Sequence, residues 1–314
     1  MLLAISGCLA GQKVRFDKGH KRDDFIMDEL SAYADYVTFC PEDMAFGSPR
    51  PSIRVVEKDG LNHIISNKTG EDLTKELNES SQKDLDLISA HKLGGIILKS
   101  KSPSCGLGSA KVYLENGFAS GKDDGMFAKM CKEKYPLLPT EEEGRLCDLW
   151  LRENFVMQLF AYDEFEKFKE NANIGGLVEF HRVHKFLLQS KDENLYRQLG
   201  NLVGNHEKKE FKEILDAYEL LYKTAIAKKS SIGKTRNVLE HMAGFLKNLI
   251  SKEEKAMLHE QIDDCAAKIV PIIVPLSTLK IFATKYEVKY LLEQTFLNPY
   301  PKELALRSSI LSVK

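Results

Sequence analysis

The hydrophobic pattern of this chain changes once, near residue 140, and that change constrains the fold more than any other feature. Before it, short apolar runs at 2–6, 36–40 and 94–100 end in turn signals, which is typical of buried strands in a parallel sheet. After it, apolar residues recur with the 3.6-residue period of amphipathic helices. We therefore predict an α/β domain with a mainly parallel, Rossmann-like sheet, followed by an all-α helical domain.

Local signals fill in the two halves. Asp59-Gly60 and Asn116-Gly117 predict hairpins over 53–66 and 111–121, and the polar periodic stretch 73–90 predicts a crossover helix. The segment PLLPTEEEG (136–144) combines prolines, three glutamates and a glycine, which favours a linker. We place the α/β domain at 1–138, the linker at 139–145 and the helical domain at 146–314.

Composition excludes several classes of protein. The 45 Lys and Arg residues nearly cancel the 46 Asp and Glu residues, which argues against a chain that coats nucleic acid without specificity. No apolar run approaches the roughly 18 residues of a membrane span, and the N-terminus lacks the basic region of a signal peptide. We expect a cytoplasmic protein without a membrane partner, in which the six scattered cysteines are free, buried or metal-bound.

Three cysteines stand where predicted strands end. Cys8 follows the run 2–6, Cys40 closes the run 36–40, and Cys105 follows the run 94–100. If these strands are neighbours, the cysteines meet at the carboxyl edge where open α/β sheets bind ligands. Three thiolates suit a soft metal or an iron–sulfur cluster, whereas a structural zinc normally takes four ligands, often in CxxC pairs, and no CxxC occurs here. The alternative is that each is a small buried hydrophobic residue. The remaining cysteines lie in helical patterns and are predicted core residues: Cys131, Cys147 and Cys265.

The segments around these cysteines resemble a known family. SGCLAGQKVRFDKGHKRD, FCPEDMAFGSPRPSIR and LKSKSPSCG resemble three signature segments of the thiouracil desulfidase (TudS-like) family, over about residues 1–135. In the second half, EFHRVHKFLL, RNVLEHMAGFLK, IVPLSTLK and QTFLNPYPKELALR resemble the YbgA-type helical domain. The combination resembles the branch of the family that converts 4-thiouridine in tRNA to uridine.

The resemblance implies a cofactor and a set of catalytic residues. It implies a 4Fe-4S cluster bound by Cys8, Cys40 and Cys105 with one iron left open. It also implies Glu42 as the acidic catalytic residue and Ser102 as the catalytic serine, with Ser104 as the alternative. Without the family resemblance, the Glu42 carboxylate, just after Pro41, would be interpreted as a helix cap. Some relatives that act on free bases carry a cysteine near position 14, where this chain has valine, which fits the tRNA branch better.

The implied reaction is hydrolytic removal of sulfur without net electron transfer. In this hypothesis the substrate sulfur binds the open iron, Glu42 activates a water molecule and Ser102 relays a proton. The implied partner is tRNA containing 4-thiouridine, and the implied product is sulfide. Two alternatives stay open: a desulfidase for free thiopyrimidine bases such as 2-thiouracil, and a non-catalytic, cluster-containing RNA-binding protein.

RNA contacts are predicted in both halves. Basic residues near the first two cysteines are candidates to hold phosphates at the mouth of the site: Arg15, His20, Lys21, Arg22, Arg50 and Arg54. Polar residues at helical spacing are candidates for an RNA-facing groove in the second domain: His181, Lys185, Arg236, Asn237 and His241. The alternatives are that His181 and His241 are buried core residues and that the basic run 221–252 is a solvated helix surface.

Overall fold

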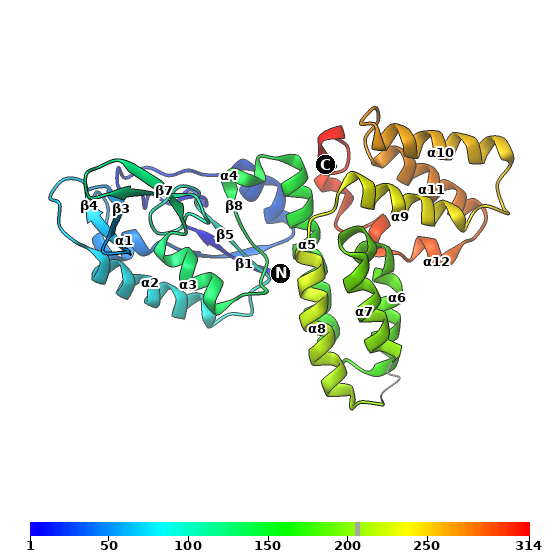
Figure 1. The fold of residues 1–314 in the computed structure, drawn as a ribbon, viewed down its shortest axis with the longest axis horizontal. Helices are drawn as coiled ribbons and strands as arrows, with labels where there is room; N and C mark the ends of the chain where they lie inside the picture. The colour runs from blue at the N-terminus through cyan, green and yellow to red at the C-terminus, as the bar shows by residue number, and fades with distance from the viewer. Residues whose placement is uncertain (205–207) are drawn as a thin grey trace. The chain divides into compact units, whose positions relative to one another are not determined.

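The computed structural model describes residues 1–204 and 208–314. The chain divides into two compact units, Met1–Cys147 and Asp148–Lys314. The first unit is α/β and the second is mostly helical, so the predicted order of fold classes is confirmed (Figure 1).

The first unit contains a parallel sheet, sheet A, with the strand order β2-β1-β5-β8. Every neighbouring pair in it is parallel. The strands span β1 Leu2–Ser6, β2 Asp35–Phe39, β5 Gly95–Leu98 and β8 Thr140–Glu142. The two central strands are buried almost throughout, which explains why they have continuous apolar sequences. Three of the four strands lie where the sequence predicts them.

Strand β8 corrects the prediction of a linker at 139–145. This segment pairs with β5 and continues into α4 (Glu143–Leu146), so it belongs to the first unit. The glutamates are not solvated: Glu141 and Glu142 are buried, and Glu142 accepts hydrogen bonds from the Leu107 N–H and from Ser109 Oγ (2.6 Å). A run of acidic residues normally indicates a solvated loop. Here the sequence misleads because the hydrogen-bond partners of Glu142 lie more than thirty positions earlier in the chain.

Both predicted hairpins form, and they join into a second sheet, sheet B, in the order β4-β3-β6-β7. Its strands span β3 Ile53–Lys58, β4 Leu61–Ser66, β6 Ala110–Leu114 and β7 Ala119–Asp123. The two hairpins meet through the parallel pair β3 and β6. This pairing joins segments distant in sequence and was not part of the prediction, which places a single sheet in this domain.

Helices complete both units. The first contains α1 Pro41–Phe46, α2 Thr74–Ser89 and α3 Met126–Lys134, and α2 is the predicted crossover helix. The second contains α5 Leu149–Lys169, α6 Ile174–Lys191, α7 Glu193–Gly204, α8 Phe211–Ala227, α9 Ile232–Gly244, α10 Lys252–Ala266, α11 Ile273–Lys285 and α12 Lys289–Leu292. Among the described residues, none of these helices has the length and apolar character required to cross a bilayer.

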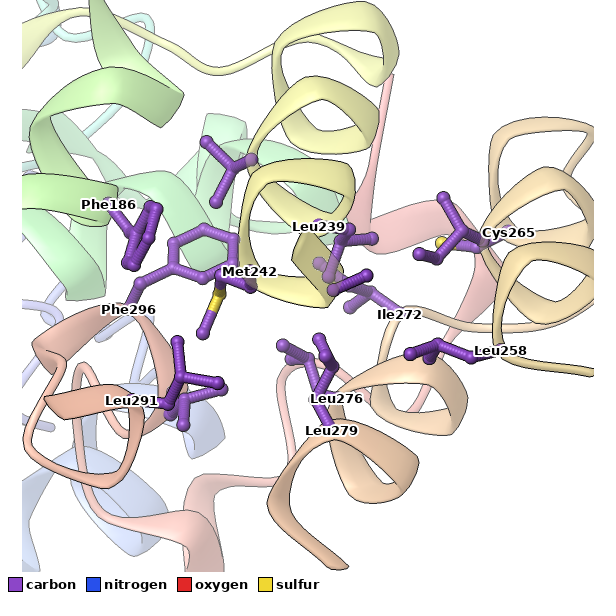
Figure 2. Close-up of a cluster of buried hydrophobic side chains, with 14 of the residues drawn as sticks. Phe186, Leu239, Met242, Leu258, Cys265, Ile272, Leu276, Leu279, Leu291 and Phe296 are labelled. Carbon is purple, nitrogen blue, oxygen red and sulfur yellow. The ribbon is translucent and has the colours of Figure 1, made fainter. Parts of the chain in front are cut away.

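The core of the second unit explains its helical periodicity. Figure 2 shows Phe186, Met242 and Leu276 packed together with apolar side chains of α9, α10 and α11. Cys265 belongs to this core, and Cys131 is buried in the first unit, as predicted. Cys147 is exposed instead, because it lies just after the short helix α4, at the boundary between the units.

Candidate active site

The three cysteines at the strand ends line one pocket of about 330 Å³ in the first unit. Strand β1 pairs with β2 on one side and with β5 on the other, and the register Ser6↔Phe39 brings the ends of β1 and β2 level. Cys8 therefore lies two residues beyond β1, Cys40 directly beyond β2, and Cys105 in the loop after β5. This is the carboxyl edge of a parallel sheet, where open α/β folds place ligands.

All three thiols are free; Cys8 and Cys105 are buried, and Cys40 is half-buried. Burial raises the pKa of the Cys8 thiol to about 11, an effect that the nearby Lys99 ammonium opposes. Burial also raises the pKa of Cys105 to about 12 and that of Cys40 well above its ordinary range. Thiols in this state are protonated near neutral pH, so a metal that binds them must displace protons.

The donor set of the pocket consists of three cysteine sulfurs, which suits an iron–sulfur cluster. Among residues 1–204 and 208–314, no group of three or more His, Cys, Asp or Glu side chains is arranged to hold one metal ion. One zinc ion would require thiolates within about 4 Å of each other, given Zn–S bonds of about 2.3 Å. An iron–sulfur cluster is larger, and each thiolate binds a different iron. An all-sulfur donor set around a pocket of this volume suits such a cluster.

Glu42 forms one wall of this cysteine pocket. Helix α1 begins at Pro41 and places Glu42 in its first turn. The carboxylate reaches across the pocket, where Oε1 accepts hydrogen bonds from Ser102 Oγ and Ser104 Oγ, both at 2.8 Å. The hydrogen-bond partners of Glu42 thus lie on the loop that carries Cys105. This position favours a role for Glu42 in the pocket over the alternative that it caps a helix.

Arg50 holds the other side of the Glu42 carboxylate. Its Nη2 donates to Glu42 Oε2 at 3.1 Å, and its Nη1 donates to the carbonyl oxygens of Val14 (3.0 Å) and Gly47 (2.8 Å). The side chain is only 3% exposed. Arg50 was predicted as an RNA contact, but its buried guanidinium is engaged within the protein, so we assign it to positioning Glu42. Sequence alone carries no signal for this pair.

The two candidate serines have different environments. Ser102 Oγ accepts hydrogen bonds from the backbone N–H groups of Ser104 and Cys105, both at 3.2 Å, which shapes the loop. Ser104 is buried, and its Oγ lies 3.5 Å from Cys105 Sγ. The two hydroxyls lie 2.9 Å apart. A hydrogen-bonded path therefore connects Glu42 with the thiol of Cys105 through Ser104, either directly or by way of Ser102.

A second polar group on the pocket wall was not predicted. Lys99 forms an ion pair with Glu143 and donates to the Ser100 carbonyl at 3.1 Å. Glu143 also accepts the Ser100 N–H at 2.6 Å. Lys99 and Ser100 both line the cysteine pocket. The sequence hides this group because Glu143 lies in the acidic run that resembles a linker.

Comparisons with known proteins identify relatives of the first unit. Residues 3–143 match the family described as 2-thiouracil desulfurase. The chain is 31% identical to the uncharacterised protein YbbK of Bacillus subtilis (strain 168) over 144 residues, which are 90% of that protein and 42% of this chain. The chain belongs to the 2-thiouracil desulfurase family. Its relatives also include a solved structure, the [4Fe-4S]-dependent thiouracil desulfidase TudS, which is 27% identical, with a TM-score of 0.37, and covers 46% of this chain and 91% of that one.

The second unit has relatives of its own. Residues 185–301 match a family described as a protein of unknown function, DUF1722. The chain is also 24% identical to the uncharacterised protein YbgA of Escherichia coli (strain K12), over 92% of that protein and 49% of this chain. The predicted fusion of a desulfurase domain with a YbgA-like domain is thus confirmed.

The basic residues of the desulfurase domain have different surroundings. Arg15 and Lys21 line the cysteine pocket. His20 and Arg22 are exposed and are not among its lining residues, and Arg22 forms ion pairs with Asp24 and Asp28. Arg54 lines a neighbouring pocket. The role of these residues in binding RNA stays a prediction.

The predicted contacts of the second unit lie on α6 and α9, which pack against each other. His181 is half-buried, with its Nδ1 3.1 Å from the Tyr218 hydroxyl and its ring stacked on Tyr196, an environment closer to the core alternative. Burial lowers the pKa of His181 to about 4. The other predicted contacts on these helices are at least partly exposed: Lys185, Arg236, Asn237 and His241. Of these, Arg236 forms an ion pair with Asp263.

Proposed function

We propose that this protein is an iron–sulfur-dependent desulfidase that removes sulfur from 4-thiouridine in tRNA, giving uridine and sulfide. One observation carries the proposal: Cys8, Cys40 and Cys105 line a single pocket whose wall presents Glu42 hydrogen-bonded to Ser102 and Ser104. Membership of the 2-thiouracil desulfurase family supports the reaction class.

The reaction exchanges one atom without net oxidation or reduction. A thiocarbonyl and one water molecule give a carbonyl and hydrogen sulfide, so the carbon–sulfur bond breaks and the water oxygen becomes the new carbonyl oxygen. A 4Fe-4S cluster on the three cysteines would supply a soft Lewis acid for the substrate sulfur at its open iron.

The side chains of the pocket supply the proton transfers. Glu42 is the base that takes a proton from water, and Arg50 holds its carboxylate in position. Ser102 passes a proton to the departing sulfur or to the ring nitrogen, and it is already hydrogen-bonded to Glu42 Oε1 at 2.8 Å. Ser104 is the alternative relay, since it makes the same contact with Glu42 and also lies next to Cys105.

Two features favour tRNA over a free base as the substrate. The chain carries a second, helical domain, and Arg15 and Lys21 add positive charge to the lining of the pocket. A nucleotide inside folded tRNA must leave its stack to reach the cysteines, as other base-modifying enzymes require of their targets.

A free thiopyrimidine such as 2-thiouracil is the second candidate substrate. The description of the matching family favours it, and a pocket of about 330 Å³ has room for one base. The two candidates differ in what lies beyond the base: a ribose and phosphates for tRNA, and solvent for a free base.

The decisive experiment gives anaerobically reconstituted protein three substrates: tRNA containing 4-thiouridine, free 4-thiouracil and free 2-thiouracil. Mass spectrometry of the digested tRNA follows conversion of 4-thiouridine to uridine. Cys105→Ala is expected to abolish both iron binding and turnover, and Glu42→Ala to retain the cluster but lose turnover. Cys147→Ala is the matched control, because this cysteine is exposed and is not a lining residue of the pocket.

Each outcome selects one function. Conversion of tRNA without conversion of the free bases establishes the proposed reaction, and the reverse establishes a free-base desulfidase. Salt-sensitive tRNA binding by the cluster-loaded protein without any sulfide release would leave a non-catalytic RNA-binding protein.

A further inference from the structure

A second pocket of about 300 Å³ adjoins the cysteine pocket in the first unit. The two share Ile53, Lys101 and Pro103 as lining residues, so one wall separates them. The polar lining of this second pocket is cationic, with Arg54, Lys101 and Lys111, and no Asp or Glu is among the described residues that line it.

Sheet B builds this cationic surface from neighbouring strands. In the parallel pair of β3 and β6, Val55 lies opposite Val112, and both point into the core. The preceding residues, Arg54 and Lys111, therefore lie side by side on the other face of the sheet. Lys111 is also directly opposite Lys122 on β7. Like charges at such positions destabilise a sheet unless an anion lies between them.

Among the described residues, no carboxylate fills that role. In the cysteine pocket, Lys99 is paired with Glu143, and Arg50 with Glu42. Within the described part of the chain, by contrast, no carboxylate lies at ion-pair distance from Arg54, Lys101 or Lys111.

Arg54 itself is held in place but not satisfied. Its guanidinium lies over the ring of Tyr113, 5.9 Å from the ring centroid, and the side chain is half-buried. Its Nε is buried and finds no hydrogen-bond partner in residues 1–204 and 208–314. A buried donor without an acceptor destabilises a protein, and an anionic oxygen in the pocket would remove that cost.

We propose that this second pocket is a phosphate subsite, which binds a phosphate group of the nucleotide whose base enters the cysteine pocket. The inference rests on the proposed function for the identity of that base. The planar fork of Arg54 matches the geometry of phosphate oxygens, and Lys101 and Lys111 add charge without competing carboxylates. The shared wall with Lys101 lets one nucleotide occupy both pockets. A free thiopyrimidine base has no group for this second pocket.

The test compares substrates that differ in phosphate alone. Cluster-loaded wild-type protein and Arg54→Gln and Lys111→Gln variants are assayed with 4-thiouridine, 4-thiouridine 5′-monophosphate and tRNA containing 4-thiouridine. Each variant is expected to lower kcat/KM for a phosphate-bearing substrate by about tenfold or more, the effect of one charge-assisted hydrogen bond. The value for the nucleoside is expected to stay within about twofold. Lys75→Gln is the matched control, because it makes the same change of charge at an exposed position of α2.

The arms also identify the source of the phosphate. A loss with the monophosphate assigns the pocket to the nucleotide's own 5′-phosphate, and a loss with tRNA alone assigns it to a neighbouring phosphodiester. Equal losses with nucleoside and phosphate-bearing substrates would show a purely structural role for Arg54 and overturn the subsite, as would no loss at all.

A binding measurement keeps the subsite separate from the proposed reaction. Calorimetry with the metal-free protein is expected to show that uridine monophosphate binds at least about tenfold more tightly than uridine, and that Arg54→Gln removes the difference. If no thiolated substrate is converted by wild-type protein, the proposed function fails, and this titration still decides the subsite. Equal affinities for uridine and its monophosphate would refute it.

Discussion

Replacing Arg50 by methionine should destabilise the first unit strongly, because Arg50 forms a buried ion pair with Glu42. The pair it forms with Glu42 is shielded from solvent, with the two side chains 3% and 15% exposed. The weak energies of surface ion pairs therefore do not apply. Removing one partner of a buried pair costs about 3–5 kcal/mol. Since Glu42 keeps its hydrogen bonds to Ser102 and Ser104, we expect the lower end, about 3 kcal/mol of unfolding free energy.

A double-mutant cycle separates the pair from the other contacts of Arg50. Arg50 also binds the carbonyl oxygens of Val14 and Gly47, and those contacts are lost in any Arg50→Met variant. Combining it with Glu42→Gln removes both charges together. We expect the double variant to be less destabilised than the sum of the single variants by about 2 kcal/mol.

Hydrogen exchange followed by mass spectrometry is the appropriate assay, because the chain's single tryptophan lies outside this unit. The slowest amides of β1 and β5 report the opening of the whole unit. A loss of about 3 kcal/mol corresponds to exchange roughly 150-fold faster. Arg15→Met is the control, since Arg15 lines the same pocket but pairs at 3.5 Å with the exposed Asp17, and it should cost less than about 1 kcal/mol. Additive single effects, or equal effects of Arg15→Met and Arg50→Met, would refute this reasoning.

Three further predictions concern the second unit, and urea unfolding followed by the fluorescence of Trp150 tests each of them. Burial lowers the pKa of His181 to about 4, so the unfolded chain takes up a proton before the folded unit does, and stability should fall by up to about 3 kcal/mol between pH 6.5 and 4. His181→Gln should flatten this profile. Burial lowers the pKa of Lys191 to about 8, so stability should rise as the pH increases from about 8 to 10.5, and Lys191→Met should remove that rise. Ser251 and Glu254 form a capping box at the start of α10, and Ser251→Ala should cost about 1 kcal/mol while Ser251→Thr should cost little.

These predictions have clear counter-results. A pH profile that persists in His181→Gln or in Lys191→Met would assign the titration to other groups. A Ser251→Ala variant as stable as wild type would show that the cap contributes nothing measurable to α10.

The parts of the fold that could be predicted are those in which the signal is local. Strands β1 and β5 are buried almost throughout, and their continuous apolar sequences show it. Strand β8 has only three residues, two of them glutamates, and its burial depends on partners in the loop after β5. Helix α10 carries a weaker signal, because its few buried positions lie among many charged residues.

The same distinction holds for the site. The meeting of Cys8, Cys40 and Cys105 could be predicted because parallel strands end at a common edge. The pairs Arg50–Glu42 and Lys99–Glu143 could not. The first depends on how the segment after α1 folds back, and the second depends on the pairing of β8 with β5. Sequence thus indicates which chemistry gathers at the sheet edge, and the structure supplies the residues that hold it in position.

The strand order of sheet A also has a consequence for how the protein is made. Because β1 lies between β2 and β5, the three thiols become neighbours only after segments from distant parts of the chain have paired. A chain still emerging from the ribosome with β5 unsynthesised presents two of the three thiols and no complete cradle. For the iron–sulfur cluster of the proposed function, the sheet must therefore form before all three thiols can bind it. Such a cluster would add its binding free energy to the stability of the sheet, so a chelator that removes it would also lower the temperature at which the first unit unfolds.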